Sequence, residues 1–189
     1  MKEKKKILAV YAVEEEYVEI PTVNYQVFYC KTGIGKVAAA YHLMEALANY
    51  TPDLVVNFGS SGSLIHEIGE VLTCSIFVDR DMQPLTALKI TSKYNFSSQL
   101  LQTFPDFPIK EFYSCNTGDS FVTEKIPFEG DVVDMEAFSI AYICWQKKIP
   151  FLSIKCVTDV IGKNSVQLWE EKLALAREQL QKKVRVLFK

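Results

Sequence analysis

The stretch from Val132 to Asp159 constrains the fold most, because it predicts a strand, a helix and a second strand in close succession. Acidic residues lie only where the two strands end: Asp134 and Glu136 follow the first strand, and Asp159 follows the second. In open α/β sheets, ligands bind just outside the carboxyl ends of the strands. Acids confined to those positions indicate a site rather than a solvated face.

The rest of the chain alternates in the same way between apolar strand-like runs and helix-like segments. This alternation predicts an α/β fold with a mixed or mostly parallel sheet. At 189 residues the chain fits a single domain that spans residues 1–189. The region 82–108 is rich in Pro, Ser, Thr and Asn and is expected to be the least regular part. Strands are expected at residues 6–13, 23–30, 54–58, 71–78, 112–115, 132–133 and 151–158. Helices are expected at residues 37–50 and 167–188, and a further helix is expected to begin at Glu136.

Composition argues against several classes of protein. The net charge of −2 gives no bulk attraction to nucleic acid or to an anionic membrane. The sequence has no apolar run of membrane-spanning length and no hydrophobic signal segment, so we expect a cytosolic protein. The five cysteines are scattered among apolar neighbours and are expected to be reduced. No Cys and His residues have metal-ligand spacing, so we expect no metal site.

A glycine pattern, Gly33-x-Gly35-x-x-Ala38, is similar to a dinucleotide-binding fingerprint. That interpretation requires an acid at the end of the next strand to hold a ribose. Here Asp53 precedes the next expected strand instead. We therefore favour a tight turn whose glycines let a helix pack close to the sheet, and we expect no cofactor.

Two further segments follow buried strands at the edge where a ligand would bind. Of Glu14, Glu15 and Glu16, one is expected to point inward, although consecutive acids are usually solvated. Gly59-Ser60-Ser61-Gly62 is expected to form a turn. It is either an ordinary connection or a turn whose amides hold an anion or an oxygen atom.

Each of the three acids in the first stretch has a structural and a functional interpretation. Asp134 is placed to cap the following helix. Glu136 begins a largely apolar helix, where a buried carboxylate needs hydrogen bonds, and sugar hydroxyls are good donors. Asp159 either caps the segment that follows it or acts as a general acid, because a buried aspartic acid with few partners can hold a proton near neutrality.

Several short motifs, taken in order, resemble the nucleoside phosphorylase/nucleosidase superfamily. The greatest similarity is to the 5′-methylthioadenosine/S-adenosylhomocysteine nucleosidases. The resemblance covers nearly the whole chain, and its combination of motifs is specific although each alone is weak. The matching segments are Ala12-Val13-Glu14-Glu15-Glu16, residues 32–40 from Thr32 to Ala40, Asn57-Phe58-Gly59-Ser60-Ser61-Gly62, Gly118-Asp119-Ser120-Phe121, Val133-Asp134-Met135-Glu136-Ala137 and Val157-Thr158-Asp159.

The resemblance implies a three-layer α/β/α sandwich, a homodimer and hydrolysis of the N-glycosidic bond of a purine nucleoside. It implies that Asp159 protonates N7 of the purine, that Glu136 holds the ribose hydroxyls and that Glu16 activates the attacking water. Ser60 or Ser61 would help to hold that water.

The resemblance also implies the remaining contacts to the substrate. Met135 would pack on the sugar, and Phe121 would stack on the purine with the Val122 backbone near its edge. Gly62 and Asp134 would border the same site. Lys155 is at the position where the family commonly has an arginine. A lysine keeps the positive charge but lacks the planar, forked arrangement of donors of a guanidinium group.

Charge favours hydrolysis over phosphorolysis. A carboxylate would repel phosphate by roughly 4 kcal/mol per charge pair at about 4 Å and an intermediate dielectric. Phosphorolysis would require arginine side chains to bind the phosphate. We expect no arginine near the glycine turns. The alternatives that stay open are a purine nucleoside phosphorylase, a futalosine hydrolase, an AMP nucleosidase and a non-catalytic nucleoside-binding protein.

Overall fold

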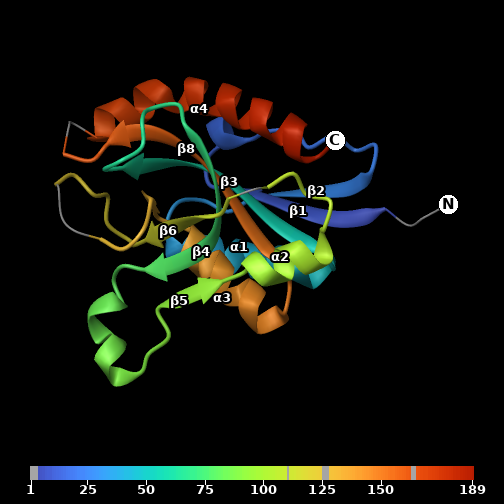
Figure 1. Ribbon diagram of the computed structural model, residues 1–189, viewed down its shortest axis with the longest axis horizontal. Helices are drawn as coiled ribbons and strands as arrows, with labels where there is room; N and C mark the ends of the chain where they lie inside the picture. The colour runs from blue at the N-terminus through green and yellow to red at the C-terminus, as the bar shows by residue number, and fades with distance from the viewer. Residues whose placement is uncertain (1–3, 110, 125–127, 163–164) are drawn as a thin grey trace.

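A computed structural model describes residues 4–109, 111–124, 128–162 and 165–189. Within these residues, eight strands form one mixed sheet, and helices cover both of its faces (Figure 1). The strands are β1 (Lys5–Tyr11), β2 (Tyr25–Lys31), β3 (Leu54–Ser63), β4 (Val71–Asp79), β5 (Lys93–Asn95), β6 (Tyr113–Thr117), β7 (Val132–Asp134) and β8 (Phe151–Val160). The helices are α1 (Lys36–Asn49), α2 (Ser97–Thr103), α3 (Ala137–Lys147) and α4 (Ser165–Leu187), with 3-10 turns η1 (Glu14–Glu16) and η2 (Gln83–Leu88).

Most strand pairs in the sheet are parallel, as the alternation of strands and helices predicts. Strand β1 pairs in parallel with β2 and β3, and β3 pairs in parallel with β8. The pairs β4–β6 and β6–β7 are also parallel, whereas β3–β7, β4–β5 and β4–β8 are antiparallel. The carboxyl ends of the parallel strands β1, β3 and β8 therefore lie at one edge of the sheet, where the short antiparallel strand β7 pairs with Gly62 of β3.

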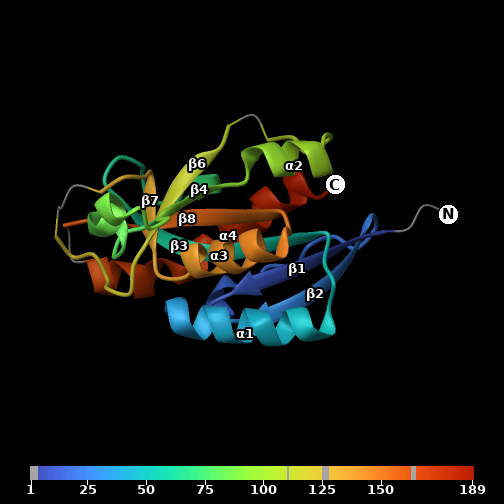
Figure 2. The same ribbon diagram turned by 90° about the horizontal axis from the view of Figure 1, so that it is seen from below.

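The helices form two layers around the sheet, which confirms the expected α/β/α arrangement. Helix α4 packs on β8 and β3 from one side, while α1 and α3 pack on each other on the opposite side (Figures 1 and 2). Leu180 and Val184 of α4 and Leu43 of α1 are fully buried. Ile7 to Val10 of β1 are also fully buried, as expected for a strand that is covered on both faces.

Two parts of the chain differ from the sequence-based expectation. Residues Gly59 to Ser63 do not form a turn, because they continue β3 and pair with residues 155–160 of β8. Their backbone hydrogen bonds to β8 hold them extended despite their small side chains. Within the region 82–108, helix α2 and strand β5 add regular structure that the Pro- and Ser-rich sequence does not predict.

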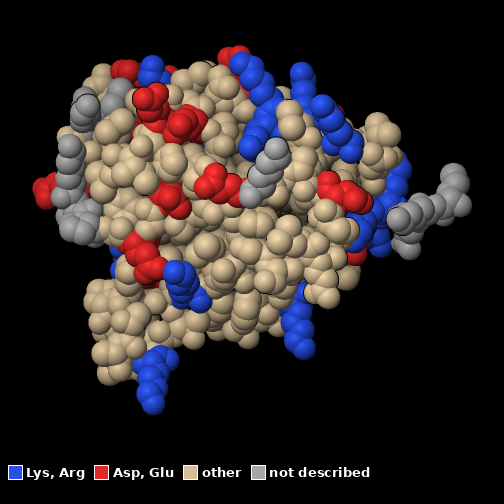
Figure 3. Space-filling model, in the orientation of Figure 1, with Lys and Arg blue, Asp and Glu red and all other residues tan. Residues whose placement is uncertain are grey.

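The surface carries charges of both signs. On the face shown in Figure 3, Lys and Arg side chains lie among Asp and Glu side chains, with a broad uncharged area between them. None of the described helices combines the length and the apolar character that a membrane crossing requires.

Candidate active site

A cavity of about 170 Å³ lies where β1, β3, β7 and β8 end. A buried water needs roughly 15 Å³ on this measure, so the cavity is large enough for a small organic group. All of the predicted site residues except Lys155 line it. The lining residues are Ala12, Val13, Glu16, Ile34, Ser60, Ser61, Gly62, Arg80, Ser120, Phe121, Val122, Val133, Asp134, Met135, Glu136, Asp159 and Trp169.

Glu16 is the one acid of its run that points inward. Its side chain is buried, whereas Glu14 and Glu15 are exposed. One carboxylate oxygen, Oε1, accepts hydrogen bonds from the Ser60 amide at 2.7 Å and the Ser60 hydroxyl at 2.6 Å. The other oxygen accepts from the amides of Ala12 at 3.2 Å and Val13 at 3.4 Å. An amide of the segment 59–62 therefore does hold an oxygen atom, and that oxygen belongs to Glu16.

Asp159 reaches the cavity from inside β8, where only 2% of its surface is exposed. It does not cap a helix, because α4 begins only at Ser165. The Thr158 hydroxyl donates to Asp159 Oδ1 at 3.1 Å. Across the β3–β8 pair, a Cβ atom on Gly62 would lie 2.8 Å from Asp159 Oδ2. A larger residue at position 62 would have to displace this carboxyl group.

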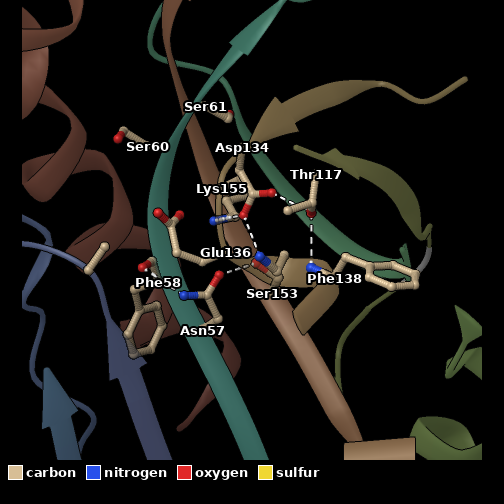
Figure 4. A network of polar contacts seen from close by, with 12 residues as sticks. Asn57, Phe58, Ser60, Ser61, Thr117, Asp134, Glu136, Phe138, Ser153 and Lys155 are labelled. Carbon is tan, nitrogen blue, oxygen red and sulfur yellow. Dashed lines mark hydrogen bonds and ion pairs between the residues drawn. The ribbon is translucent and has the colours of Figure 1, made fainter. Parts of the chain in front are cut away.

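Asp134, which lines the cavity, forms a buried ion pair with Lys155 (Figure 4). Lys155 Nζ lies 2.7 Å from Asp134 Oδ2, and both side chains are 1% exposed. Asp134 also accepts from the Thr117 hydroxyl at 2.6 Å and from the Ala137 amide at 2.9 Å, so it caps α3 as expected. Burial alone would raise the pKa of Asp134, but the Lys155 charge and the hydrogen bonds lower it overall.

Lys155 thus lies against Asp134 rather than in the cavity wall. Burial alone would lower the pKa of Lys155, but the neighbouring charge of Asp134 raises that pKa above its ordinary value. A Cβ atom on Gly59 would lie 2.7 Å from Lys155 Nζ, so a larger residue there would have to displace the ammonium group. The lysine supplies one positive charge among three acids, Glu16, Asp134 and Glu136.

The charge of Lys155 is taken up mainly by Asp134, so it does little to offset the burial of Glu136. Burial and, next, the charge of Asp134 raise the pKa of Glu136 to about 8. Its Oε1 accepts a hydrogen bond from the Gly35 amide at 2.8 Å. Gly33 and Gly35 have φ angles of 77° and 91°, which favour glycine, so the pattern Gly33-x-Gly35 forms the expected tight turn. That turn presents an amide to Glu136.

Two of the lining residues, Trp169 and Arg80, belong neither to the predicted site residues nor to the segments that carry the family resemblance. Trp169 of α4 contacts Phe121 edge to face, with ring centroids 6.5 Å apart. Arg80, which follows β4, corrects the expectation that no arginine lies nearby. Its guanidinium donates to the Ser120 carbonyl at 2.8 Å and to Asn116 Oδ1 at 3.1 Å. Neither residue belongs to a local motif, so no sequence signal marks them.

The chemistry available in this cavity is acid–base chemistry. Glu16, Glu136 and Asp159 come from distant segments and face one apolar hollow, where one acid can donate a proton and another can accept one around a single ligand. Among the described residues, no three His, Cys, Asp or Glu side chains are grouped closely enough to hold a metal ion.

Comparison with known proteins gives a consistent result. The sequence profile described as "Phosphorylase superfamily" matches residues 11–189. A 5′-methylthioadenosine/S-adenosylhomocysteine nucleosidase from Tolumonas auensis is 27% identical over 185 residues, which cover 85% of this chain and 80% of that protein. A nucleosidase of the same name from Bacillus velezensis is 29% identical over 178 residues, which cover 79% of this chain and 76% of that protein.

Solved structures share the fold. The nucleosidase of the same name from Colwellia psychrerythraea, in complex with adenine, superposes with a TM-score of 0.78 at 23% identity and covers 98% of this chain and 95% of its own. The futalosine hydrolase of Helicobacter pylori also gives a TM-score of 0.78, at 17% identity, and covers 97% of both chains.

Proposed function

The chain belongs to the phosphorylase superfamily, and on this premise we propose that it is a purine nucleosidase. Its substrate is 5′-methylthioadenosine, S-adenosylhomocysteine or a related 5′-modified adenosine, and its reaction is hydrolysis of the N-glycosidic bond. The observation that carries this proposal is the meeting of Glu16, Glu136 and Asp159 at one cavity. The names of the relatives that align over most of the chain support the choice of substrate.

In this proposal Asp159 is the general acid. A buried carboxyl group holds its proton more readily than an exposed one. Asp159 donates that proton to N7 of the purine while the bond between C1′ and N9 breaks, and the bonding electrons leave with the base. Phe121 stacks on the purine, with the Val122 backbone at its edge, and Met135 packs on the sugar.

Glu16 and Glu136 act on the sugar side of the same reaction. Glu136 accepts hydrogen bonds from the ribose hydroxyls. Glu16 takes a proton from the water that attacks C1′, and its negative charge stabilises the cation-like sugar. The products are the free base and the 5′-modified ribose. Exchange with solvent then returns the proton to Asp159 and removes it from Glu16.

Arg80 is the one observation that favours a second candidate, an enzyme that uses a phosphate group. It lines the same cavity, and arginine is well suited to bind phosphate. Such an enzyme would be a purine nucleoside phosphorylase or an AMP nucleosidase. Hydrolysis remains the better proposal, because the guanidinium already donates to Asn116 and Ser120 and the cavity also contains Glu16.

We further propose that the enzyme is a cytosolic homodimer that associates through α1. Val37, Tyr41 and Met44 recur at helical spacing on this helix and are 81%, 60% and 43% exposed. Helix α1 lies in the outer layer that it forms with α3 (Figure 2). Exposed apolar stripes of this kind mark interaction surfaces. Ile34, which lines the cavity, is also exposed and precedes this helix, so the second copy would lie near the cavity. The cytosolic location is supported by the five free cysteines, because thiols stay reduced in the cytosol.

A panel of nucleosides tests the reaction and its substrate together. The protein is incubated in phosphate-free buffer with 5′-methylthioadenosine, S-adenosylhomocysteine, adenosine, futalosine and AMP, and the free base is measured by chromatography. We expect base release that is fastest for the first two. Release only after phosphate is added would select a phosphorylase, and fastest release from AMP or futalosine would select those activities. Binding of a nucleoside without any release would select a non-catalytic binding protein.

A further inference from the structure

Helix α4 makes a direct polar contact with the residue that holds Glu16. The indole Nε1–H of Trp169 donates to the Ser60 hydroxyl oxygen at 2.7 Å. The same hydroxyl donates to Glu16 Oε1 at 2.6 Å. Three residues from α4, β3 and η1 thus form one continuous chain of hydrogen bonds that ends on a buried acid.

The directions of these hydrogen bonds follow from the chemistry of the groups. An indole N–H is only a donor, whereas a hydroxyl has one hydrogen and can also accept. Because Trp169 donates, the Ser60 oxygen is the acceptor in that contact, and its single hydrogen is free to point at Glu16. A hydroxyl that accepts one hydrogen bond also donates the next one more strongly.

We infer that Trp169 is a positioning residue, which acts through Ser60 to fix the orientation of the Glu16 carboxylate. This inference rests on the proposed function, in which Glu16 is the base. Trp169 also contacts Phe121, the proposed purine platform, so one side chain links the base-stacking part of the cavity to the acid that activates water. Trp169 thereby has two separable roles, one for its ring and one for its N–H group.

Trp169→Phe separates these roles, because phenylalanine keeps an aromatic ring and lacks the N–H donor. We expect kcat to fall roughly threefold to tenfold, the size of one neutral hydrogen bond. Any change in KM reports the loss of the larger indole ring and of its contact with Phe121. The decisive comparison is a double-mutant cycle with Ser60→Ala. In the Ser60→Ala background the effect of Trp169→Phe on kcat should vanish, while its effect on KM should persist. An equal loss of kcat in both backgrounds would overturn the inference.

Proton NMR tests the contact without any turnover. The chain has two tryptophans, so Trp145→Phe assigns the two indole N–H resonances. Ser60→Ala should shift the Trp169 indole resonance and leave that of Trp145 in place. An unmoved Trp169 resonance would show that the contact is absent and would refute the inference even in an active enzyme. A shifted resonance in a protein that releases no base would instead count against the proposed function alone.

Discussion

Glu136 makes the stability of the protein depend on pH. Its pKa is raised from 4.5 to about 8 in the folded protein, so the folded state holds this proton more tightly than the unfolded state does. The stabilising contribution is fully present below about pH 4.5 and is lost as the pH rises to about 8. Each pKa unit corresponds to about 1.36 kcal/mol, so the loss is on the order of a few kcal/mol. Asp134, whose pKa is lowered, is ionised throughout the range from pH 5 to pH 8 and adds no slope there.

We therefore expect the wild-type free energy of unfolding to fall between pH 5 and pH 8, with a shallower fall in Glu136→Gln. The amide lacks the titrating proton and should make the variant the more stable protein at pH 8. Urea denaturation of both proteins across this range measures the effect. Parallel pH dependences in the two proteins would show that Glu136 does not titrate there.

Gly62 is a residue where the fold leaves little room for a side chain. In Gly62→Ala, the new Cβ would lie 2.8 Å from Asp159 Oδ2 and 3.2 Å from Val133 Cγ2. We expect a loss of about 1–3 kcal/mol in stability, typical of overpacking, and displacement of the Asp159 carboxyl group. Ser61→Ala is the matched neighbour, because it removes only a hydrogen bond to the Cys156 carbonyl. A Gly62→Ala protein no less stable than Ser61→Ala in thermal denaturation would contradict this description of the site.

Among the elements, α4 combines a packing role with its contact to the site. Leu180 is fully buried on the side of α4 that faces the sheet. Leu180→Ala should cost about 2–5 kcal/mol of stability. Lys182→Ala breaks only an exposed i,i+4 pair with Glu178 and should cost about 0.3–0.5 kcal/mol. Denaturant titration of both variants measures the difference, and similar costs would mean that α4 does not pack on the sheet in solution.

The sequence predicts the elements whose burial follows a simple pattern and misses those fixed by distant contacts. The apolar runs at β1 and β8 and the helix after Glu136 are visible directly in the sequence. The extension of β3 through Gly59–Ser63 is not, because its extended conformation depends on pairing with β8, about 95 residues away in the chain. Helix α2 buries Leu100 but carries no continuous apolar stripe, so its sequence resembles a loop.

The same distinction applies to the site. The position of Glu16, Glu136 and Asp159 at the cavity could be predicted, because each follows a buried strand or begins a buried helix. Arg80 and Trp169 could not, because one lies in a charged turn and the other on an amphipathic helix. Only the folding of β4 and α4 against the loop at Ser120–Phe121 brings them to the cavity.

For the molecule as a whole, the apolar stripe on α1 predicts self-association. Val37→Lys places a charge in the proposed interface and should convert the dimer to a monomer in analytical ultracentrifugation. Val186→Lys makes the same change at another exposed valine, on α4 in the opposite layer, and should leave the dimer intact. A wild-type protein that sediments as a monomer at all concentrations, or equal behaviour of the two variants, would rule out this interface.

The most direct test of the central claim is the rate of adenine release from 5′-methylthioadenosine in phosphate-free buffer by four proteins. We predict that the wild type and Glu14→Gln, which changes an exposed neighbour outside the cavity lining, release adenine at the same rate. Glu16→Gln and Asp159→Asn should lower kcat by about 10²–10⁴-fold, the usual contribution of a general acid or base. Turnover by either of these variants within a few-fold of the wild type, or no release by the wild type, would contradict the account.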